Sequence, residues 1–466
     1  YNGSPTIYKD LVFVGTNSAP GALRAFDVRR GIKRWEFTSI PQAGQPGSET
    51  WQSADNKTNN GALAWSFSRT IDAARGIIYV VFDAPAPDYY GGARPGDNLY
   101  GTSIVAIQAE TGKYLWHFQA VHHDLWDYDL PSAPGLLDVR INGQTVPIIA
   151  AAGKTGYLYI LNRVTGKPVF GMEERPVMAS DAPGEVSSRT QPIPVKPGPI
   201  ARVSYKPEDL VTAADTTAEH AAFCKALVER SGGLFNVGPF TPYLYRAPGA
   251  PPRSTILFPG SVGGANWGGT SADPTLGYIF VNTMDEASIG WVTQRPGLNG
   301  GPPIWVRGSI VGSTSRFQWK DAPENSGGNI DDAGERAWPC QRPPWGNLLA
   351  INARTGDIAW RVPLGITDEL PVDKQRTGRL NMGGPITTAG GLVFIGASND
   401  RRFRAFDSRT GRELWVTKLP MSAHAVPVTY MGADGKQYVA ITAAGASALD
   451  DPGPAGEEAL IVFRLP

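Results

Sequence analysis

The sequence lacks several features that would mark other classes of protein. Its 466 residues carry 43 basic and 43 acidic side chains, so there is no excess of positive charge of the kind that a nucleic-acid surface needs. No stretch reaches the roughly 18 consecutive apolar residues of a membrane-spanning helix. Neither a nucleic-acid-binding protein nor a chain with a membrane-spanning helix is therefore expected.

Cysteine is also scarce, with Cys224 and Cys340 far apart in the sequence. Neither belongs to a Cys-x-x-Cys pair, so a cysteine-rich metal site is not expected. The two can be joined as a disulfide, which fits an oxidising compartment, or can be two buried thiols. No signal peptide is visible, and residues 1–15 already look like a strand, so we expect a processed or incomplete chain.

Glycine (55 residues), proline (40) and tryptophan (13) are plentiful, which favours many turns between short strands. One phrase recurs five times: an apolar strand, an Asp, Asn or Gln corner, a glycine turn and a strand that ends in an aromatic residue. Its copies are residues 23–35 (LRAFDVRRGIKRW), 104–116 (IVAIQAETGKYLW), 158–170 (LYILNRVTGKPVF), 348–360 (LLAINARTGDIAW) and 403–415 (FRAFDSRTGRELW). No copy can bury its apolar face alone, so the copies must stack on one another.

Runs that are apolar on both faces precede many of these copies, as expected for strands buried between stacked sheets. They lie at residues 11–15, 76–82, 147–151, 277–282, 391–396 and 437–442. A run followed by a repeated hairpin gives a four-stranded unit of the kind that forms propeller blades. We count about seven such units and predict an all-β propeller that forms a single domain over residues 1–466.

Two segments interrupt this rhythm. Residues 171–253 are rich in proline and contain one expected helix at residues 218–230, and residues 286–345 are rich in glycine and proline. Long connections in a compact domain are usually functional or disordered. We expect both segments to be long loops on one face of the propeller, where they could wall a central pocket.

The densest group of reactive side chains lies at residues 122–131 (HHDLWDYDLP), on the connection that follows the second copy of the phrase. Histidine and aspartate at such spacing could bind a metal ion. A carboxylate beside Trp126 could instead act as a general base whose pKa is raised by partial desolvation. The third interpretation is a loop fastened to its blade by hydrogen bonds from Asp and His.

The repeated phrase resembles the tryptophan-docking motif of the quinoprotein dehydrogenases, which use pyrroloquinoline quinone (PQQ). Residues 117–131 (HFQAVHHDLWDYDLP) are very similar to the corresponding segment of the glucose/quinate dehydrogenase branch of that family. Further matches follow in order along nearly the whole chain, at residues 89–98 (YYGGARPGDN), 153–156 (GKTG), 190–192 (TQP), 264–268 (GANWG) and 381–385 (NMGGP). The resemblance implies an eight-bladed propeller with the quinone on its axis, of which this chain would lack the first blade.

The resemblance also implies roles for individual residues. Asp127 matches the catalytic base, and Lys154 matches the basic residue that contacts the reactive oxygens of the quinone. Trp65 matches the tryptophan on which the flat cofactor stacks. The other positions that match cofactor contacts are Asn266, Trp267, Asn282, Gly384 and Asp400.

A calcium ion, or another divalent or lanthanide ion, is implied against the quinone, and here the sequence departs from the family. The loop where an acidic ligand is expected offers only Asn17, and the family's Asn or Ser ligand falls at Ala84 with Asp83 beside it. Asp127 and Asp129 complete the expected ligand set.

Taken together, these residues imply a PQQ-dependent dehydrogenase on the periplasmic side of the membrane, acting on a sugar, polyol or cyclic alcohol. Its electrons would pass to a membrane quinone or a cytochrome. The alternative is a non-catalytic propeller scaffold of the outer-membrane-assembly type, which reuses similar blades without a cofactor. The retention of Asp127, Lys154 and Trp65 speaks against that alternative, since a scaffold needs none of them.

Overall fold

The computed structural model describes residues 5–16, 21–53, 62–64, 68–297, 300–310, 316–320, 337–445 and 457–464. Trp65 and Asn17 lie outside these ranges. The described residues form nine sheets, of which two have only two strands and the other seven have three or four. The all-β architecture agrees with the sequence prediction, whereas the eight blades implied by the resemblance stay a prediction.

Five of the seven larger sheets contain a copy of the repeated phrase. The first two are β1 (Thr6–Tyr8), β2 (Leu11–Gly15), β3 (Ala22–Asp27) and β4 (Lys33–Thr38), then β5 (Arg69–Asp72), β6 (Ile77–Phe82), β7 (Ser103–Gln108) and β8 (Tyr114–Gln119). The third has β9 (Gly135–Ile141), β10 (Gln144–Ala152) and β11 (Leu158–Asn162). The other two are β16 (Thr270–Asp273), β17 (Tyr278–Met284), β22 (Gly346–Asn352) and β23 (Ile358–Pro363), and β24 (Ile386–Thr387), β25 (Leu392–Ile395), β26 (Arg402–Asp407) and β27 (Glu413–Lys418).

The remaining larger sheets are β14 (Leu234–Phe235), β15 (Ser254–Leu257), β18 (Ser288–Arg295) and β19 (Ile304–Gly308), and β28 (Val428–Met431), β29 (Gln437–Ala443) and β30 (Ala459–Arg464). Two hairpins complete the strands: β12 (Met172–Pro176) with β13 (Thr190–Pro194), and β20 (Gln318–Lys320) with β21 (Ala337–Pro339). The helices are α1 (Ala218–Arg230) and the short 3₁₀ turns η1 (Ser48–Thr50), η2 (Pro207–Asp209) and η5 (Val372–Lys374). None of the helices in the described ranges is long and apolar enough to cross a membrane.

The repeated phrase docks each sheet onto the next. The indole nitrogen of Trp35 donates to the carbonyl of Ala109 at 2.9 Å, and the ring of Trp35 covers Gly112 of the second copy. A Cβ on Gly112 would lie 2.8 Å from that ring, and Gly112 has a φ of +75°. Both the close contact and the left-handed backbone conformation therefore require glycine at this position. Trp116 and Trp360 repeat this contact on Gly166 and Gly411 of the following copies.

A second regularity explains the alanine at the third position of four copies of the phrase. Ala25, Ala106, Ala350 and Ala405 each lie opposite the tryptophan of their own hairpin, and the register shifts directly after each alanine. A small residue leaves room for the indole across the strand pair, and the bulge twists the hairpin so that the ring can reach the next sheet.

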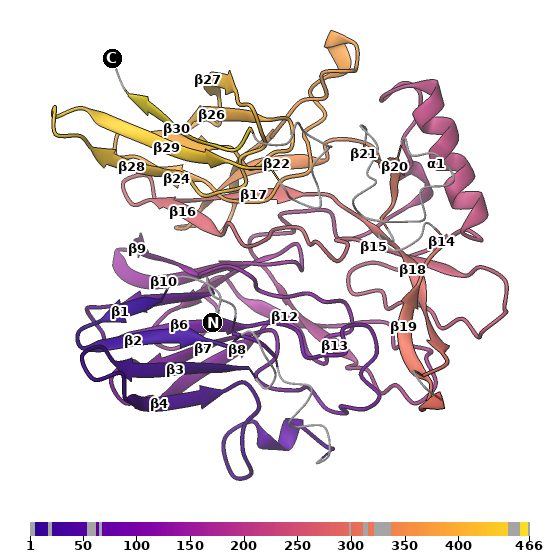
Figure 1. Ribbon diagram of the computed structural model, residues 1–466, viewed down its shortest axis with the longest axis horizontal. Coiled ribbons are helices and arrows are strands. Elements are labelled where there is room, and N and C mark those ends of the chain that lie inside the picture. The colour runs from indigo at the N-terminus through magenta and orange to yellow at the C-terminus, as the bar shows by residue number, and fades with distance from the viewer. Residues whose placement is uncertain are drawn as a thin grey trace.

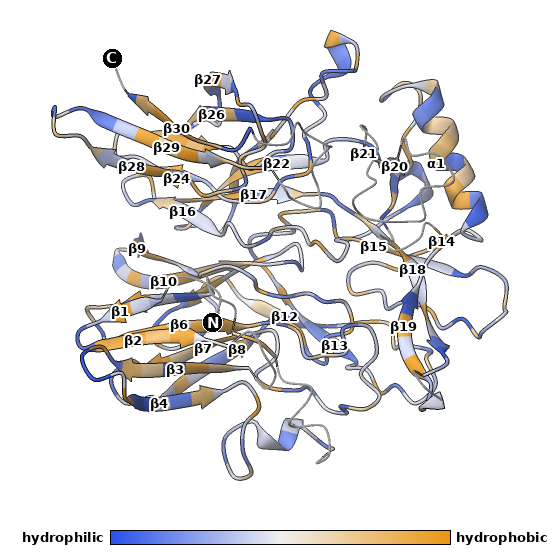
Figure 2. Ribbon diagram, in the orientation of Figure 1, coloured by the Kyte–Doolittle hydropathy of each residue, from blue (hydrophilic) through white to orange (hydrophobic). Residues whose placement is uncertain are grey.

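Apolar cores lie between successive sheets rather than at one centre. The β2 and β3 side chains Phe13 and Leu23 share a cluster with Ile78 and Val80 of β6. Comparable clusters join the second sheet to the third, the third to the β16–β17–β22–β23 sheet, and so on to β29. Figure 1 shows the resulting arrangement, with the β1–β10 sheets in the lower half of the view and the β16–β17, β22–β30 sheets in the upper half. Figure 2 shows the apolar central strands, such as β2 and β6, in orange.

The two segments that we expected to be long loops contain secondary structure of their own. Residues 171–253 carry β12, β13, β14 and α1, and the bounds of α1 are those predicted. Residues 286–345 carry β18 to β21, and β18 pairs with β15 rather than with its chain neighbour β17. The chain therefore leaves one sheet after β17, adds two strands to another, and returns at β22 to pair with β17.

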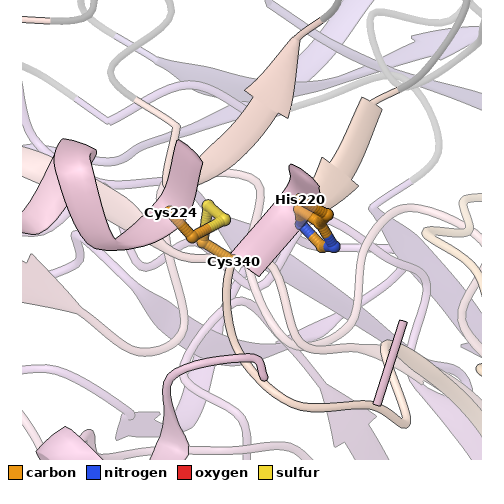
Figure 3. Close-up of side chains that lie close together, drawn as sticks. All are labelled: His220, Cys224 and Cys340. Atoms are coloured by element: carbon orange, nitrogen blue, oxygen red, sulfur yellow. A yellow bond between two sulfur atoms is a disulfide. The ribbon is translucent and has the colours of Figure 1, made fainter. Parts of the chain in front are cut away.

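Cys224 of α1 and Cys340 after β21 form a disulfide, which resolves the alternative left open by the sequence. His220 lies beside it (Figure 3), and this trio is the one place in the described residues where three His, Cys, Asp or Glu ligand atoms lie within 4.8 Å of one another. Because the two sulfur atoms are bonded to each other, neither is a thiolate that could bind a metal ion. The trio is a structural staple between α1 and residues 337–341.

Candidate active site

The 122–131 segment is held in place by buried polar side chains. Asp124 accepts hydrogen bonds from the backbone N–H groups of Trp126 (2.9 Å) and Tyr128 (3.1 Å) and from the hydroxyl of Thr102 (2.8 Å). His123 contacts the Gly96 carbonyl and the Glu185 carboxylate, each at 2.7 Å. The interpretation of a fastened loop is thus right for His123 and Asp124, which support the segment.

Asp127 is turned out of this loop by an unusual backbone conformation. Its φ is +62°, in the left-handed region that non-glycine residues seldom occupy. The hydrogen bonds of Asp124 to the residues on either side hold this conformation. Residues held in strained backbone conformations are frequent at functional sites. The backbone conformation of Asp127 therefore supports a functional role for this residue.

Lys154 joins Asp127 to Asp129. Its ammonium lies 2.9 Å from a carboxylate oxygen of Asp127 and 2.8 Å from one of Asp129. The Lys154 and Asp129 side chains are almost fully buried, whereas that of Asp127 is 23% exposed. The Asp127 carboxylate is therefore the part of this trio that a small molecule can reach.

The electrostatics of the trio depend on burial. Burial raises the pKa of Asp127 well above its usual range, and Asp129 and Asp88 add to this effect while Lys154 opposes it. For Lys154, burial alone would lower the pKa, but the charges of Asp129 and Asp127 outweigh it and raise the pKa. Lys154 is therefore an ammonium at every ordinary pH, and Asp127 is a carboxylate poised to take up a proton.

Backbone contacts connect Lys154 to the segment that carries two further predicted residues, Asn266 and Trp267. The carbonyls of Lys154 and Gly153 accept hydrogen bonds from Gly264 (3.0 Å) and Ala265 (3.2 Å), which directly precede Asn266 and Trp267. Asn266 and Trp267 are both partly exposed. The amide of Asn266 folds back on its own segment, donating to the Val262 carbonyl at 2.6 Å and accepting from the Trp267 N–H at 2.8 Å.

Gly384 and Asn282 lie at the next contact. A Cβ on Gly268 would lie 1.6 Å from the Gly383 carbonyl, and one on Gly384 would lie 2.1 Å from the Gly268 carbonyl, so these backbones touch. Asn282, at the end of β17, donates to the side chain of Asn381 at 2.7 Å. Segments 264–268 and 381–385, matched separately in the sequence, thus meet in space, and with Lys154 they form one connected region.

Asp400 is occupied elsewhere. Its carboxylate pairs with Arg404, accepts from the Ser398 hydroxyl and accepts from the backbone of Ile366 at 3.0 Å. Burial alone would raise the pKa of Asp400, but these partners together lower it. The contacts give Asp400 a structural role, and a cofactor contact for it stays a prediction.

The expected metal ligands are placed in part. The Asp83 carboxylate accepts from the backbone of Leu63, and the adjacent Ala84 N–H donates to Asp129 at 2.6 Å. The carboxylate oxygens of Asp83, Asp127 and Asp129 do not all lie within 4.8 Å of one another, so they do not form a closed ligand set in this structure. Their carboxylate oxygens are the ligand type that calcium prefers. Lys154 already neutralises part of the charge of Asp127 and Asp129, so it would share these oxygens with any bound ion.

Sequence reasoning missed three residues around this region: Asp124, Glu286 and Arg307. Asp124 belongs to residues 122–131, but the sequence alone does not distinguish its supporting role from the role of Asp127. Glu286 and Arg307 lie in a segment read as a loop, and only the pairing of β18 and β19 with the β15 sheet brings them near the other residues. No local sequence pattern predicts that β18 pairs with β15.

Comparison with known families agrees with this architecture. The sequence matches the family described as PQQ: Glucose/ethanol/alcohol dehydrogenase, beta-propeller domain, over residues 4–439. The chain therefore belongs to the β-propeller family of the PQQ glucose, ethanol and alcohol dehydrogenases.

Individual relatives fall in the branch that the sequence suggested. The chain is 34% identical to a quinate/shikimate dehydrogenase (quinone) of Acinetobacter baylyi over 476 residues, covering 97% of this chain and 56% of the relative. It is 32% identical to a quinoprotein glucose dehydrogenase of Escherichia coli, covering 95% of this chain and 55% of the relative. The chain thus spans little more than half the length of these relatives.

Solved structures show the same fold. A quinohemoprotein alcohol dehydrogenase from Comamonas testosteroni aligns with a TM-score of 0.64 at 23% identity, over 99% of this chain and 59% of its own. A europium-containing methanol dehydrogenase aligns with a TM-score of 0.62 at 21% identity, over 95% of this chain and 65% of its own.

Proposed function

We propose that this chain is the cofactor-binding catalytic part of a PQQ-dependent dehydrogenase that oxidises a hydroxyl group of a sugar, polyol or cyclic alcohol. The observation that carries the proposal is the buried Lys154 ammonium between Asp127 and Asp129, with the Asp127 carboxylate open to a small molecule. Membership of the PQQ dehydrogenase family supplies the cofactor class.

The residues fit an acidic, planar quinone. Lys154 offers a permanent positive charge, and the partly exposed Asn266 and Trp267 lie on the segment that packs against it. Lys154, Asn266, Trp267, Asn282 and Gly384 would hold the cofactor, together with Trp65. When bound, PQQ supplies the acceptor for the hydride that leaves the substrate carbon.

In this proposal Asp127 accepts the proton of the substrate hydroxyl. A carboxylate with a raised pKa is a better base near neutral pH than an ordinary aspartate. Lys154 fixes the position of that carboxylate and stabilises negative charge that develops beside it. Asp129 holds Lys154 in place, and Asp124 holds the loop conformation that presents Asp127.

A calcium or related ion would be held by oxygens of Asp83, Asp127 and Asp129, with Asn17 as a further ligand. The proposed electron acceptor is a membrane quinone or a cytochrome, and the name of one relative includes a quinone. The proposed location is the periplasm. The scaffold alternative is not favoured, since a scaffold does not require a buried lysine between two aspartates.

The test is the variant Asp127→Asn, assayed for dye-linked oxidation of sugars, polyols and quinate after loading with PQQ and calcium. We expect turnover to fall by roughly 100-fold or more, since general-base catalysis contributes about 10²–10⁴-fold, while PQQ remains bound. The matched control is Asp357→Asn, which removes an exposed aspartate paired with Lys196 and should leave turnover unchanged. Full activity in Asp127→Asn would rule out Asp127 as the base.

A further inference from the structure

Arg307 of β19 is fixed beside the 122–131 loop by aromatic contacts. Its guanidinium carbon lies 4.7 Å above the ring centroid of Tyr89, and one of its N–H groups donates to the Tyr89 hydroxyl at 3.2 Å. The Tyr89 ring meets the edge of Tyr243 at 5.6 Å, and both rings pack on the apolar cluster that contains Trp126 and Tyr128. Arg307 therefore reaches the candidate active site from a strand far along the chain.

The charge of Arg307 has no counterion among the residues that the structure describes. Its contacts there are with Tyr89 and the neighbouring Tyr243, whereas Lys154 is paired with two carboxylates. An arginine has five N–H donors in a planar fork, and Tyr89 uses one of them. Stacking on Tyr89 holds the fork in one plane while leaving donors available for a ligand.

Besides Asp88, the carboxylate whose charge acts on Arg307 is that of Glu286, which forms its ion pair with Arg316 at 3.7 Å. It is 2% exposed, and neither of its oxygens has a hydrogen-bond partner in the described residues. Burial raises the pKa of Glu286, although Arg316 and Arg307 oppose this. Because the ion pair of Glu286 is with Arg316, Arg307 keeps its charge without a direct counterion of its own among the described residues.

Asp88 connects Arg307 with the catalytic residues. Asp88 is exposed to solvent at its surface, but partial desolvation of its carboxyl group raises its pKa, and the charge of Asp129 adds to this. The charges of Lys154, Arg94 and Arg307 lower the pKa of Asp88. Lys154 and Arg307 thus both lie within electrostatic reach of Asp88. The phenol of the next residue, Tyr89, likewise lies within reach of both Asp127 and Arg307. Asp127 and Arg307 therefore both lie near Tyr89.

We propose that Arg307 binds a carboxylate of the substrate, which makes the substrate a polyhydroxylated ring acid rather than a neutral sugar. This inference rests on the proposed function. Arginine forms two parallel hydrogen bonds with a carboxylate, a geometry that a neutral sugar cannot use. With the acid group at Arg307, a ring hydroxyl can lie at Asp127, and Asp88 can accept hydrogen bonds from other hydroxyls of the ring.

The experiment compares shikimate with its uncharged methyl ester as substrates of the PQQ-loaded protein. We expect Arg307→Gln to lower kcat/KM for shikimate by roughly 10- to 100-fold, the range for loss of a charged hydrogen-bonded pair, with a change of less than about threefold for the ester. Arg307→Lys should recover part of the loss. The matched control is Arg246→Gln, because Arg246 also stacks on an aromatic ring, 4.2 Å from that of Trp291, outside the proposed site.

A binding measurement without turnover separates this inference from the proposed function. Calorimetric titration of the cofactor-free protein should show binding of shikimate that is weakened by Arg307→Gln, and much weaker binding of methyl shikimate. Absence of dye reduction with every substrate would contradict the proposed function, while the titration would still decide the role of Arg307. The role is overturned if the wild-type protein treats acid and ester alike, or if Arg307→Gln and Arg246→Gln have the same effect.

Discussion

At the scale of single residues, burial gives the charged side chains their different roles. Lys154 and Arg404 are both buried cations that pair with one buried and one more exposed carboxylate. Arg404 encloses the matched Asp400, which is 2% exposed, whereas Lys154 leaves the matched Asp127 23% exposed. The sequence could suggest Asp127, Lys154 and Asp400 alike, since all three lie in matched positions. It could not show that the carboxylate of Asp400 is saturated by Arg404, Ser398 and the backbone of Ile366, because those contacts form only in the folded chain.

His220 gives a pH-dependent stability that can be measured. Burial lowers its pKa from 6.5 to about 4, so between these values the unfolded chain binds a proton that the folded chain does not. The free energy of unfolding should therefore fall as the pH drops through this window, by about 2 to 3 kcal/mol between pH 7.5 and 4.5. Urea unfolding at the two pH values should show that His220→Gln loses this part of the dependence. An unchanged dependence in the variant would contradict the assignment.

At the scale of strands and hairpins, most of what positions the site could be predicted from the sequence. The repeated phrase marks its glycine turns and terminal aromatic residues directly, because each copy needs a small residue under the ring of the preceding copy. The run at residues 277–282 was predicted as a strand, but its partner β22 begins 62 residues after Met284 at Gly346. Pairing between strands so far apart in the sequence leaves no local pattern. The sequence therefore could not predict that β18 and β19 join the sheet of β15 rather than that of β17.

Docking of one hairpin on the next can be tested at Trp116. This side chain is buried and donates to the Arg163 carbonyl at 3.2 Å, and Trp116→Ala should cost about 3 to 5 kcal/mol of stability. Trp415, from the last copy of the phrase, is 38% exposed and packs edge-on against Phe463. Trp415→Ala should therefore cost distinctly less. Equal losses in chemical denaturation would mean that docking on glycine adds nothing.

The contact between residues 264–268 and 381–385 can be tested at Gly268. A methyl group there would overlap the Gly383 carbonyl, so Gly268→Ala must separate the two backbones. We expect weaker PQQ binding and a lower melting temperature, whereas Gly198→Ala, where a Cβ meets nothing within 4 Å, should change neither. Normal PQQ affinity in Gly268→Ala would show that this contact does not shape the cofactor site.

At the scale of the whole molecule, successive sheets share cores, and the long insertions are fastened separately. The disulfide between Cys224 and Cys340 ties α1 to the chain just before β22, across a sequence separation of 116 residues. The two cysteines alone could not settle whether they were joined, because their proximity depends on the path of both insertions.

Removal of that disulfide by Cys224→Ala together with Cys340→Ala should lower the free energy of unfolding by about 2 to 5 kcal/mol, since the reduced chain regains a large closed loop of conformational freedom. Chemical denaturation of the oxidised protein and the double variant measures the difference. Because the disulfide lies in the apolar cluster of α1 rather than beside Lys154, PQQ binding should persist in the variant. Identical stability with and without the bond would contradict this account of the insertions.

The measurement that tests the central claim most directly is a titration of the purified protein with PQQ in the presence of calcium, followed in the absorption spectrum, with a hydroxylated substrate added at the end. The account predicts saturable binding of one quinone per chain, followed by a spectral change to the reduced cofactor when a suitable sugar, polyol or ring acid is added. Failure to bind PQQ with calcium, with a lanthanide ion and with neither would contradict the assignment of Lys154 and its neighbours as a quinone site.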